Sequence, residues 1–352
     1  MMIRRNQIYH IAGSTLLAAA LLLLSGCADD SEQPSQNSGL QLLSATRAGD
    51  DPVALTDDGS SFMMYLATPN GTPQSVVFTY TGGQWNSGSN VSVREETQYY
   101  IYGYMPNDAD VIASIAPLTG NYANGATLTL RGLPLITDED IGIVVGVKRA
   151  TSKDDKSVAT EGEYGYFSGV SGENYVNLLM DHLYTRLRIY FCVDDNYATL
   201  RKICLKSVTL KSTYGETVDA TVTISDGSGL SAAKVSYSGA SASPVEKSAV
   251  LYSNDEVEYL KVEPEVTDRG KDVYCPHCLF DGNGTYVSIT STYDVYDKNG
   301  NLIRKDCTAT NSLKMTDMAP GVYKQLTMTV TPTYLYILSD PDLDNPTIEL
   351  RD

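Results

Sequence analysis

From Leu40 onward the pattern of hydrophobic and polar residues predicts strands almost everywhere, and helical periodicity is scarce. The longest alternating run covers residues 182–193, so we expect one long strand there with a single buried face. A short helix is predicted only over residues 195–201. Further strands are predicted at residues 62–67, 75–80, 98–104, 126–131, 141–148, 203–211, 216–224, 257–262, 285–292, 322–330 and 333–338.

Asn-Gly and Asp-Gly pairs separate these runs, with the clearest hairpin signal at residues 297–300. Such pairs tolerate the positive φ angles that tight hairpins need. Many short strands joined by turns predict an all-β chain built from β-sandwiches. We place an N-terminal sandwich at residues 40–180 and a C-terminal sandwich at residues 181–352. The Ser-, Ala- and Gly-rich residues 228–244 are expected to form a long loop in the second sandwich.

The first residues have the pattern of an export signal. Arg4 and Arg5 precede an apolar stretch at residues 11–24, which is too short for a membrane span and suits a signal peptide. The stretch ends in Leu-Ser-Gly-Cys, which resembles a bacterial lipobox with Cys27 as the lipidated residue. We therefore predict a signal peptide at residues 1–26 and a polar tether at residues 27–39. A lipid on Cys27 would anchor the mature chain to the outer membrane without a transmembrane span.

The composition of the chain argues against several classes of function. The chain of 352 residues carries a formal net charge of −17, which argues against nucleic acid as a partner. Only three histidines are present against 25 tyrosines, so a site built from several histidine ligands is excluded. No Gly-rich nucleotide-binding loop occurs. These observations predict a protein without enzymatic activity, cofactor or metal.

Three weaker chemical motifs remain as alternatives. Cys275 and Cys278 in the sequence Cys-Pro-His-Cys could serve a thiol oxidoreductase, but a strand end and a turn follow instead of the helix that such a site needs. The same cysteines with His277 and Cys307 could hold zinc, but a second Cys-x-x-Cys pair is absent. Residues 340–345 begin like a calcium loop without its later ligands, and we interpret them as a solvated acidic turn.

Four segments of the chain resemble a known family. They are residues 98–106 (QYYIYGYMP), 141–147 (IGIVVGV), 178–184 (LLMDHLY) and 334–342 (YLYILSDPD). Together with the lipobox, they resemble the fimbrillin-like superfamily, the lipoprotein subunits of type V pili of Bacteroidales.

This resemblance implies two tandem transthyretin-like β-sandwiches and a location on the cell surface. A subunit would be exported as an outer-membrane lipoprotein, and an Arg-specific protease would then remove a segment that contains its first strand. A strand from another subunit would fill the vacated place, so that the subunits polymerise into a fimbrium. Head-to-tail contacts of this kind do not close and therefore generate filaments.

The sequence contains matching parts. A short apolar run with Leu40, Leu42 and Leu43 is our candidate for the displaced strand, and Arg47 follows it. We expect Arg47 to be exposed and to be cut from Ala48, because small and turn-forming residues come next. Candidates for the donated strand lie near the C-terminus, in alternating runs and in a last short strand at residues 346–350. Their apolar residues are Leu326, Met328, Val330, Leu335 and Ile337.

These observations predict a structural pilus subunit or a tip or accessory adhesin whose partners are other pilus subunits. Few residues follow residue 338, which favours a tip or accessory subunit over a stalk subunit. An alternative is a permanently lipid-anchored surface lipoprotein, either a pilus anchor or an adhesin for a host protein or glycan, that does not polymerise.

Overall fold

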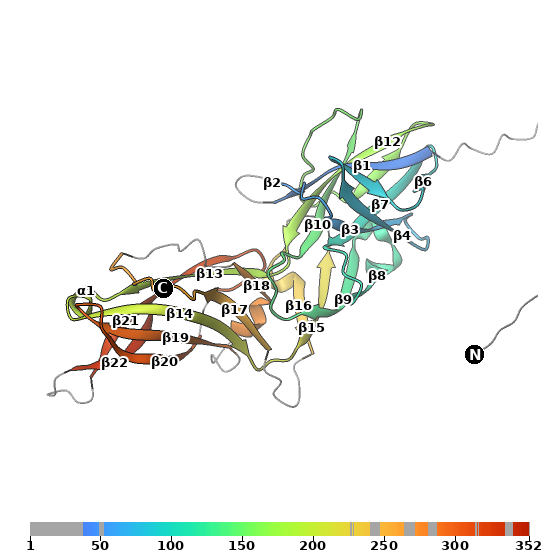
Figure 1. The fold of residues 1–352 in the computed structure, drawn as a ribbon. Helices are drawn as coiled ribbons and strands as arrows, with labels where there is room; N and C mark the ends of the chain where they lie inside the picture. Colours follow the sequence, from blue (N-terminus) through green and yellow to red (C-terminus); the bar gives the residue numbers. More distant parts are fainter. Residues whose placement is uncertain are drawn as a thin grey trace, which may run out of the picture. The chain divides into compact units, whose positions relative to one another are not determined.

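Alternating residues form strands in this protein because each strand can bury one face and leave the other partly exposed. The computed structural model describes residues 38–48, 53–225, 227, 229–239, 247–263, 272–280, 287–313, 315, 317–334 and 341–351. In these residues strands dominate and helices are short (Figure 1), which confirms the predicted all-β class. None of the helices found there has the length and apolar character needed to cross a membrane.

The largest sheet contains the first described strand. Its strands hydrogen-bond in the order β2-β1-β12-β10-β7-β3-β4-β5, with β11 beside β7 and β6 beside β1. Their bounds are β1 (Ser38–Arg47), β2 (Val53–Ala54), β3 (Ser61–Ala67), β4 (Gln74–Thr81), β5 (Gln84–Ser87), β6 (Ser92–Val93), β7 (Thr97–Met105), β10 (Gly142–Ala150), β11 (Gly165–Ser168) and β12 (Asn174–His182).

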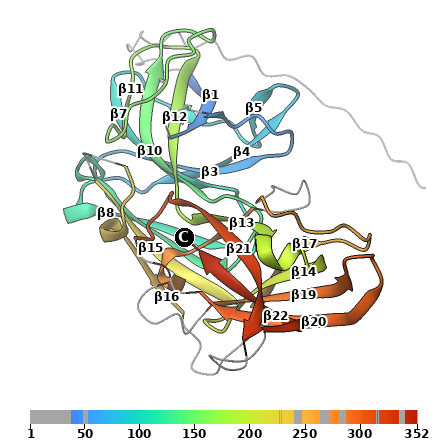
Figure 2. The same ribbon diagram turned by 90° about the vertical axis from the view of Figure 1, so that its left-hand side faces the viewer.

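Three further sheets have four strands each, in the orders β18-β13-β21-β22, β17-β14-β19-β20 and β16-β15-β9-β8. Figure 2 shows β21 between β13 and β22. The bounds are β8 (Ile112–Pro117), β9 (Ala126–Pro134), β13 (Thr185–Val193), β14 (Arg201–Ser212), β15 (Thr217–Ile224), β16 (Val235–Ser238), β17 (Lys247–Ser253), β18 (Val273–Cys275), β19 (Val287–Asp297), β20 (Leu302–Ser312), β21 (Tyr323–Tyr334) and β22 (Pro341–Arg351).

The helical elements are single turns. The predicted helix near residue 195 is confirmed as α1 (Asp195–Ala198), where the Asp194 side chain accepts a hydrogen bond of 3.1 Å from the Tyr197 amide. The 3₁₀ turns are η1 (Leu118–Gly120), η2 (Tyr122–Asn124), η3 (Ala232–Lys234) and η4 (His277–Phe280).

One sheet contains strands from both sides of the predicted boundary between residues 180 and 181. In it, β9 pairs antiparallel with β15 over Ala126–Pro134 and Thr217–Ile224. The two predicted sandwiches are therefore joined by main-chain hydrogen bonds as well as by the covalent chain. The boundary at residue 180 itself stays a prediction.

The single long strand predicted over residues 182–193 is wrong. The chain forms β12 up to His182 and β13 from Thr185 onward, with the fully buried Leu183 and Tyr184 between them. β12 pairs with β1 and β10, whereas β13 pairs with β18 and β21. The chain thus changes sheets at residues 183–184.

Most other predicted strands are confirmed within a few residues, as is the hairpin at residues 297–300 between β19 and β20. The strand predicted at residues 257–262 is wrong, because only an isolated bridge between Cys204 and Tyr259 occurs there. The loop predicted at residues 228–244 contains β16, which pairs with β15. The acidic turn predicted at residues 340–345 is also wrong from residue 341 onward, where β22 begins.

Tyrosines fill much of the interior, and the hydroxyl groups of several of them bond to the backbone. The hydroxyl of Tyr102 donates to the Tyr122 carbonyl at 2.6 Å, and that of Tyr184 donates to the Pro134 carbonyl at 2.9 Å. The Tyr102 ring also stacks on Tyr164, with 5.3 Å between the ring centroids. Each ring contributes apolar area, while its buried hydroxyl finds a backbone carbonyl as its partner.

We expect Gly103→Ala to destabilise the protein by about 1–3 kcal/mol, because an added methyl group would overpack the interior. A Cβ at Gly103, in β7, would lie 2.2 Å from the Met63 carbonyl oxygen and 2.6 Å from the Phe62 ring. Urea unfolding followed by circular dichroism measures the change. Gly88→Ala is the matched control, since nothing lies within 4 Å of its Cβ position. Equal midpoints for the two variants would contradict the expectation.

Candidate functional site

The first strand, β1, lies inside the largest sheet, where it runs parallel to β12. The paired register extends from Leu40 opposite Asn174 to Arg47 opposite Met180, with a bulge between Leu42 and Ser44. The other edge of β1 pairs with β6 at residues 38–39 and with β2 at residues 46–47. Because β2 and β6 have two residues each, the ladder with β12 is the main support of β1. We call the place that β1 fills the β1 site.

The core-facing side chains of β1 are almost fully buried. Leu40 and Leu42 are each 3% exposed and Ala45 is 1% exposed, and all three belong to the core cluster that contains Phe62 and Val176. Full burial of a leucine stabilises a fold by about 1.5–3 kcal/mol. Leu43 lies at the bulge and is only partly buried. Removing β1 would therefore expose both a row of main-chain groups and an apolar surface.

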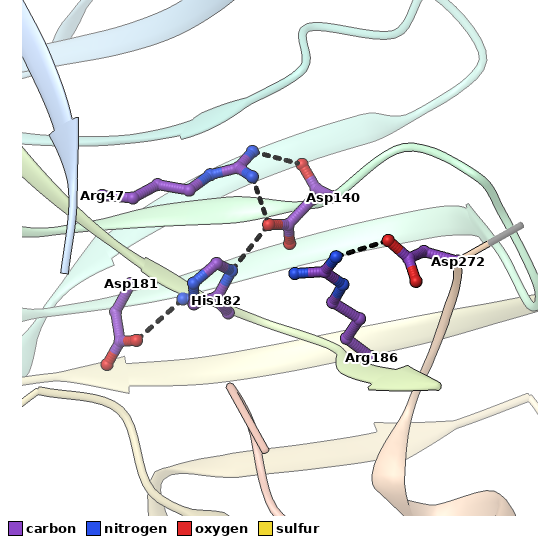
Figure 3. A network of polar contacts seen from close by, with 6 residues as sticks. All are labelled: Arg47, Asp140, Asp181, His182, Arg186 and Asp272. Carbon is purple, nitrogen blue, oxygen red and sulfur yellow. Dashed lines mark hydrogen bonds and ion pairs between the residues drawn. The ribbon is translucent and has the colours of Figure 1, made fainter. Parts of the chain in front are cut away.

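Arg47 ends β1 in a cluster of charged side chains (Figure 3). Its Nη1 forms an ion pair with Oδ2 of Asp140, and its Nη2 donates to the Asp140 carbonyl oxygen at 3.3 Å. His182, the last residue of β12, places its Nδ1 at 2.6 Å from the same Oδ2. Asp140 lies in the turn between β9 and β10, and its side chain is 4% exposed. Two strand ends thus meet at one buried carboxylate.

The expectation that Arg47 is exposed is wrong. Its side chain is 23% exposed, and its backbone pairs with both β12 and β2. The Ala48 amide donates to the Met180 carbonyl at 2.7 Å, so the Arg47–Ala48 bond also lies against β12. The sequence did not reveal this arrangement, because Asp140 is 93 positions away from Arg47. An aspartate in a polar turn gives no signal of its distant partner.

The charged side chains near Asp140, those of Asp181 and Arg186, have partners other than Asp140. Asp181 accepts from the amide of Leu230 and from that of His182, each at 2.8 Å, and burial raises the pKa of its carboxyl group. Arg186 forms an ion pair with Asp272, and its guanidinium lies 4.5 Å from the centre of the Tyr323 ring. In the part of the chain that the structure describes, the basic side chains in contact with Asp140 are Arg47 and His182.

The Cys-Pro-His-Cys motif does not have the features of a redox site. Cys275 is a fully buried free thiol at the end of β18, and burial raises its pKa, which opposes the thiolate that redox chemistry needs. A single 3₁₀ turn, η4, follows it. Among the described residues, no group of three or more His, Cys, Asp or Glu side chains is placed to hold a metal ion.

The candidate donor residues Leu326, Met328 and Val330 lie in β21, and each is at most 1% exposed. β21 pairs with β13 on one side and with β22 on the other, so it is an inner strand of its sheet. β22 is the edge strand there. Cys27, Leu335 and Ile337 lie outside the described residues, and their proposed roles stay predictions.

We expect Asp140→Asn to lower the free energy of unfolding by about 1–3 kcal/mol, a value between those of buried and surface ion pairs because Arg47 is partly exposed. The substitution keeps the side chain's shape and removes the charge that Arg47 faces. Chemical denaturation measures the loss. Asp138→Asn, an exposed residue of the same turn, is the control. A loss of equal size in both variants would show that the pair with Arg47 does not stabilise the fold.

No protein-family model and no curated protein matches the chain. Solved structures do match. A fimbrial protein from Bacteroides vulgatus is 13% identical, with a TM-score of 0.43, and the match covers 90% of this chain and 98% of that one. The fimbrial anchor protein Mfa2 from Porphyromonas gingivalis is 9% identical, with a TM-score of 0.34 and coverage of 89% and 97%. Both of these similar structures are named as fimbrial proteins.

Proposed function

We propose that the chain is a non-enzymatic pilus subunit or a tip or accessory adhesin, exported as a lipoprotein on Cys27 and assembled by strand exchange. The observation that carries this proposal is the construction of β1. This strand lies near the described N-terminal end, buries Leu40 and Leu42 in the core, and ends at an arginine. Cleavage after Arg47 would detach both the lipid and the strand.

Loss of β1 would leave an acceptor for another strand. The exposed edge of β12 would present unpaired amides and carbonyls, and the core would present the apolar surface that Leu40 and Leu42 cover. An added strand satisfies both needs at once, because its backbone continues the ladder and its side chains fill the pockets. This is the mechanism that the sequence resemblance implies.

We further propose β22 as the donated strand. β21 would have to break two ladders to leave its sheet, whereas β22 would break one. The sequence of β22 alternates Ile348 and Leu350 with polar residues and ends at Arg351. The donated strand would therefore come from the last short run named in the sequence analysis, rather than from Leu326, Met328 and Val330.

The second candidate is a permanently anchored surface lipoprotein that does not polymerise. The hydrogen-bonded and partly buried state of Arg47 favours it, because a protease must first free this residue from Asp140 and from β12. The two candidates differ in whether the lipid-bearing segment is lost.

Replacement of Arg47 by lysine tests the cleavage step. Treatment of the full chain with an Arg-specific protease should give a new N-terminus at Ala48 and ladders of oligomers in the wild type. Arg47→Lys keeps a cation beside Asp140 but should abolish both products. Intact mass and N-terminal sequencing read out the result. Arg94→Lys, at an exposed arginine, should behave like the wild type. A wild-type protein that stays monomeric with its lipidated N-terminus would favour the anchor.

Replacement of Ile348 by aspartate tests the donated strand. We expect normal cleavage at Arg47 but no oligomer ladder, since a charged residue would have to enter the apolar β1 site. Thr347→Asp, at the neighbouring position of the alternation, should still polymerise. Thermal unfolding of both monomers checks that each variant is folded. Undiminished ladders from folded Ile348→Asp would exclude β22 as the donor.

A further inference from the structure

The carboxylate of Asp140 contacts two side chains that come from different parts of the chain. Arg47 is part of β1, while His182 is part of β12. Arg47 contacts both the side chain and the main-chain carbonyl of Asp140, whereas His182 contacts only Oδ2, at 2.6 Å. The guanidinium is always charged, but the imidazole is charged only when protonated. β1 therefore supplies the permanent positive charge of this cluster.

Departure of β1 would leave Asp140 without that charge. The carboxylate is 4% exposed, and its Oδ1 accepts no hydrogen bond from any residue that the structure describes. The other guanidinium drawn in Figure 3, that of Arg186, is held by Asp272. Removing one partner of a buried ion pair is strongly unfavourable, because the remaining charge is poorly solvated. The vacated β1 site would thus combine an apolar surface with a carboxylate at its end that has lost its guanidinium partner and keeps only the contact with His182.

We propose that the β1 site selects an incoming strand that carries arginine or lysine where β1 carries Arg47. The occupant is a strand of another subunit, with apolar side chains in the places of Leu40 and Leu42 and a cation beside Asp140. This inference rests on the proposed strand exchange and adds a requirement on the partner's chemistry. A strand that lacks the cation fits the apolar pockets but leaves Asp140 with only the contact to His182.

The charge would also fix the register of the incoming strand. Backbone hydrogen bonds along β12 accept any sequence, and a slip by one residue turns every apolar side chain of the new strand to the wrong face. A single cation that must meet Asp140, close to Met180 of β12, marks the correct end. Specificity would then come from the penalty on strands that bring no charge or bring it at the wrong position.

The test uses the full chain, with the recognition sequence of a site-specific protease inserted between Asp50 and Asp51. After nicking, a fluorescent peptide of residues 38–47 is exchanged against the chain's own first strand, and fluorescence anisotropy measures its apparent Kd. Two further peptides carry Arg47→Lys and Arg47→Gln. All three are measured on the wild type, on Asp140→Asn and on the control Asp138→Asn.

We expect the Gln peptide to bind the wild type at least about tenfold more weakly than the Arg peptide, and the Lys peptide to bind within about threefold of it. On Asp140→Asn the difference between Arg and Gln should disappear, while Asp138→Asn should keep it. If Asp140→Asn does not fold, the comparison of the Arg and Gln peptides on the wild type still tests the charge requirement.

Equal binding of the Arg and Gln peptides to the wild type would overturn the charge requirement and leave strand exchange intact. A difference that persists undiminished on folded Asp140→Asn would overturn the role of Asp140. Failure of every peptide to exchange would overturn both this inference and the proposed function.

Discussion

The parallel ladder between β1 and β12 is the constraint on which the rest of the site depends. It holds Leu40 and Leu42 against the core and brings Arg47 to the end of β12, where His182 and Asp140 meet it. A strand held chiefly along one edge is a separable part of a sheet, because few main-chain bonds tie its second edge. The same ladder that completes the fold therefore defines the surface that a replacement strand would have to satisfy.

Much of the fold could be predicted from the sequence because strand formation is a local property. The β-branched and aromatic runs at residues 98–104, 141–148 and 203–211 mark β7, β10 and β14 within a few residues. The hairpin at residues 297–300 follows from the φ angles that Asn-Gly tolerates, and Gly300 indeed has φ of 88°. Signals of this kind act over a few residues and do not depend on what packs against them.

The errors have a common physical origin, because they depend on partners distant in sequence. The chain changes sheets at Leu183 and Tyr184, which are both buried, and the sequence pattern shows no break there. Arg47 was expected at the surface because its neighbours in sequence are small and polar, yet its position is set by Asp140. In both cases, contacts with residues distant in the chain decide the structure, and a single sequence does not show those contacts.

Trp85 gives the core beneath β1 a spectroscopic property. It is the chain's one tryptophan, and its side chain is 6% exposed. Its ring packs edge-on against Tyr80, with 5.4 Å between the ring centroids, and it lies in the same core cluster as Leu40 and Leu42. Indole emission depends on the polarity around the ring, so water that enters the space left by these leucines would shift it to longer wavelength. The molecule thus contains an intrinsic optical reporter, free of competing indole signals, of whether its first strand is in place.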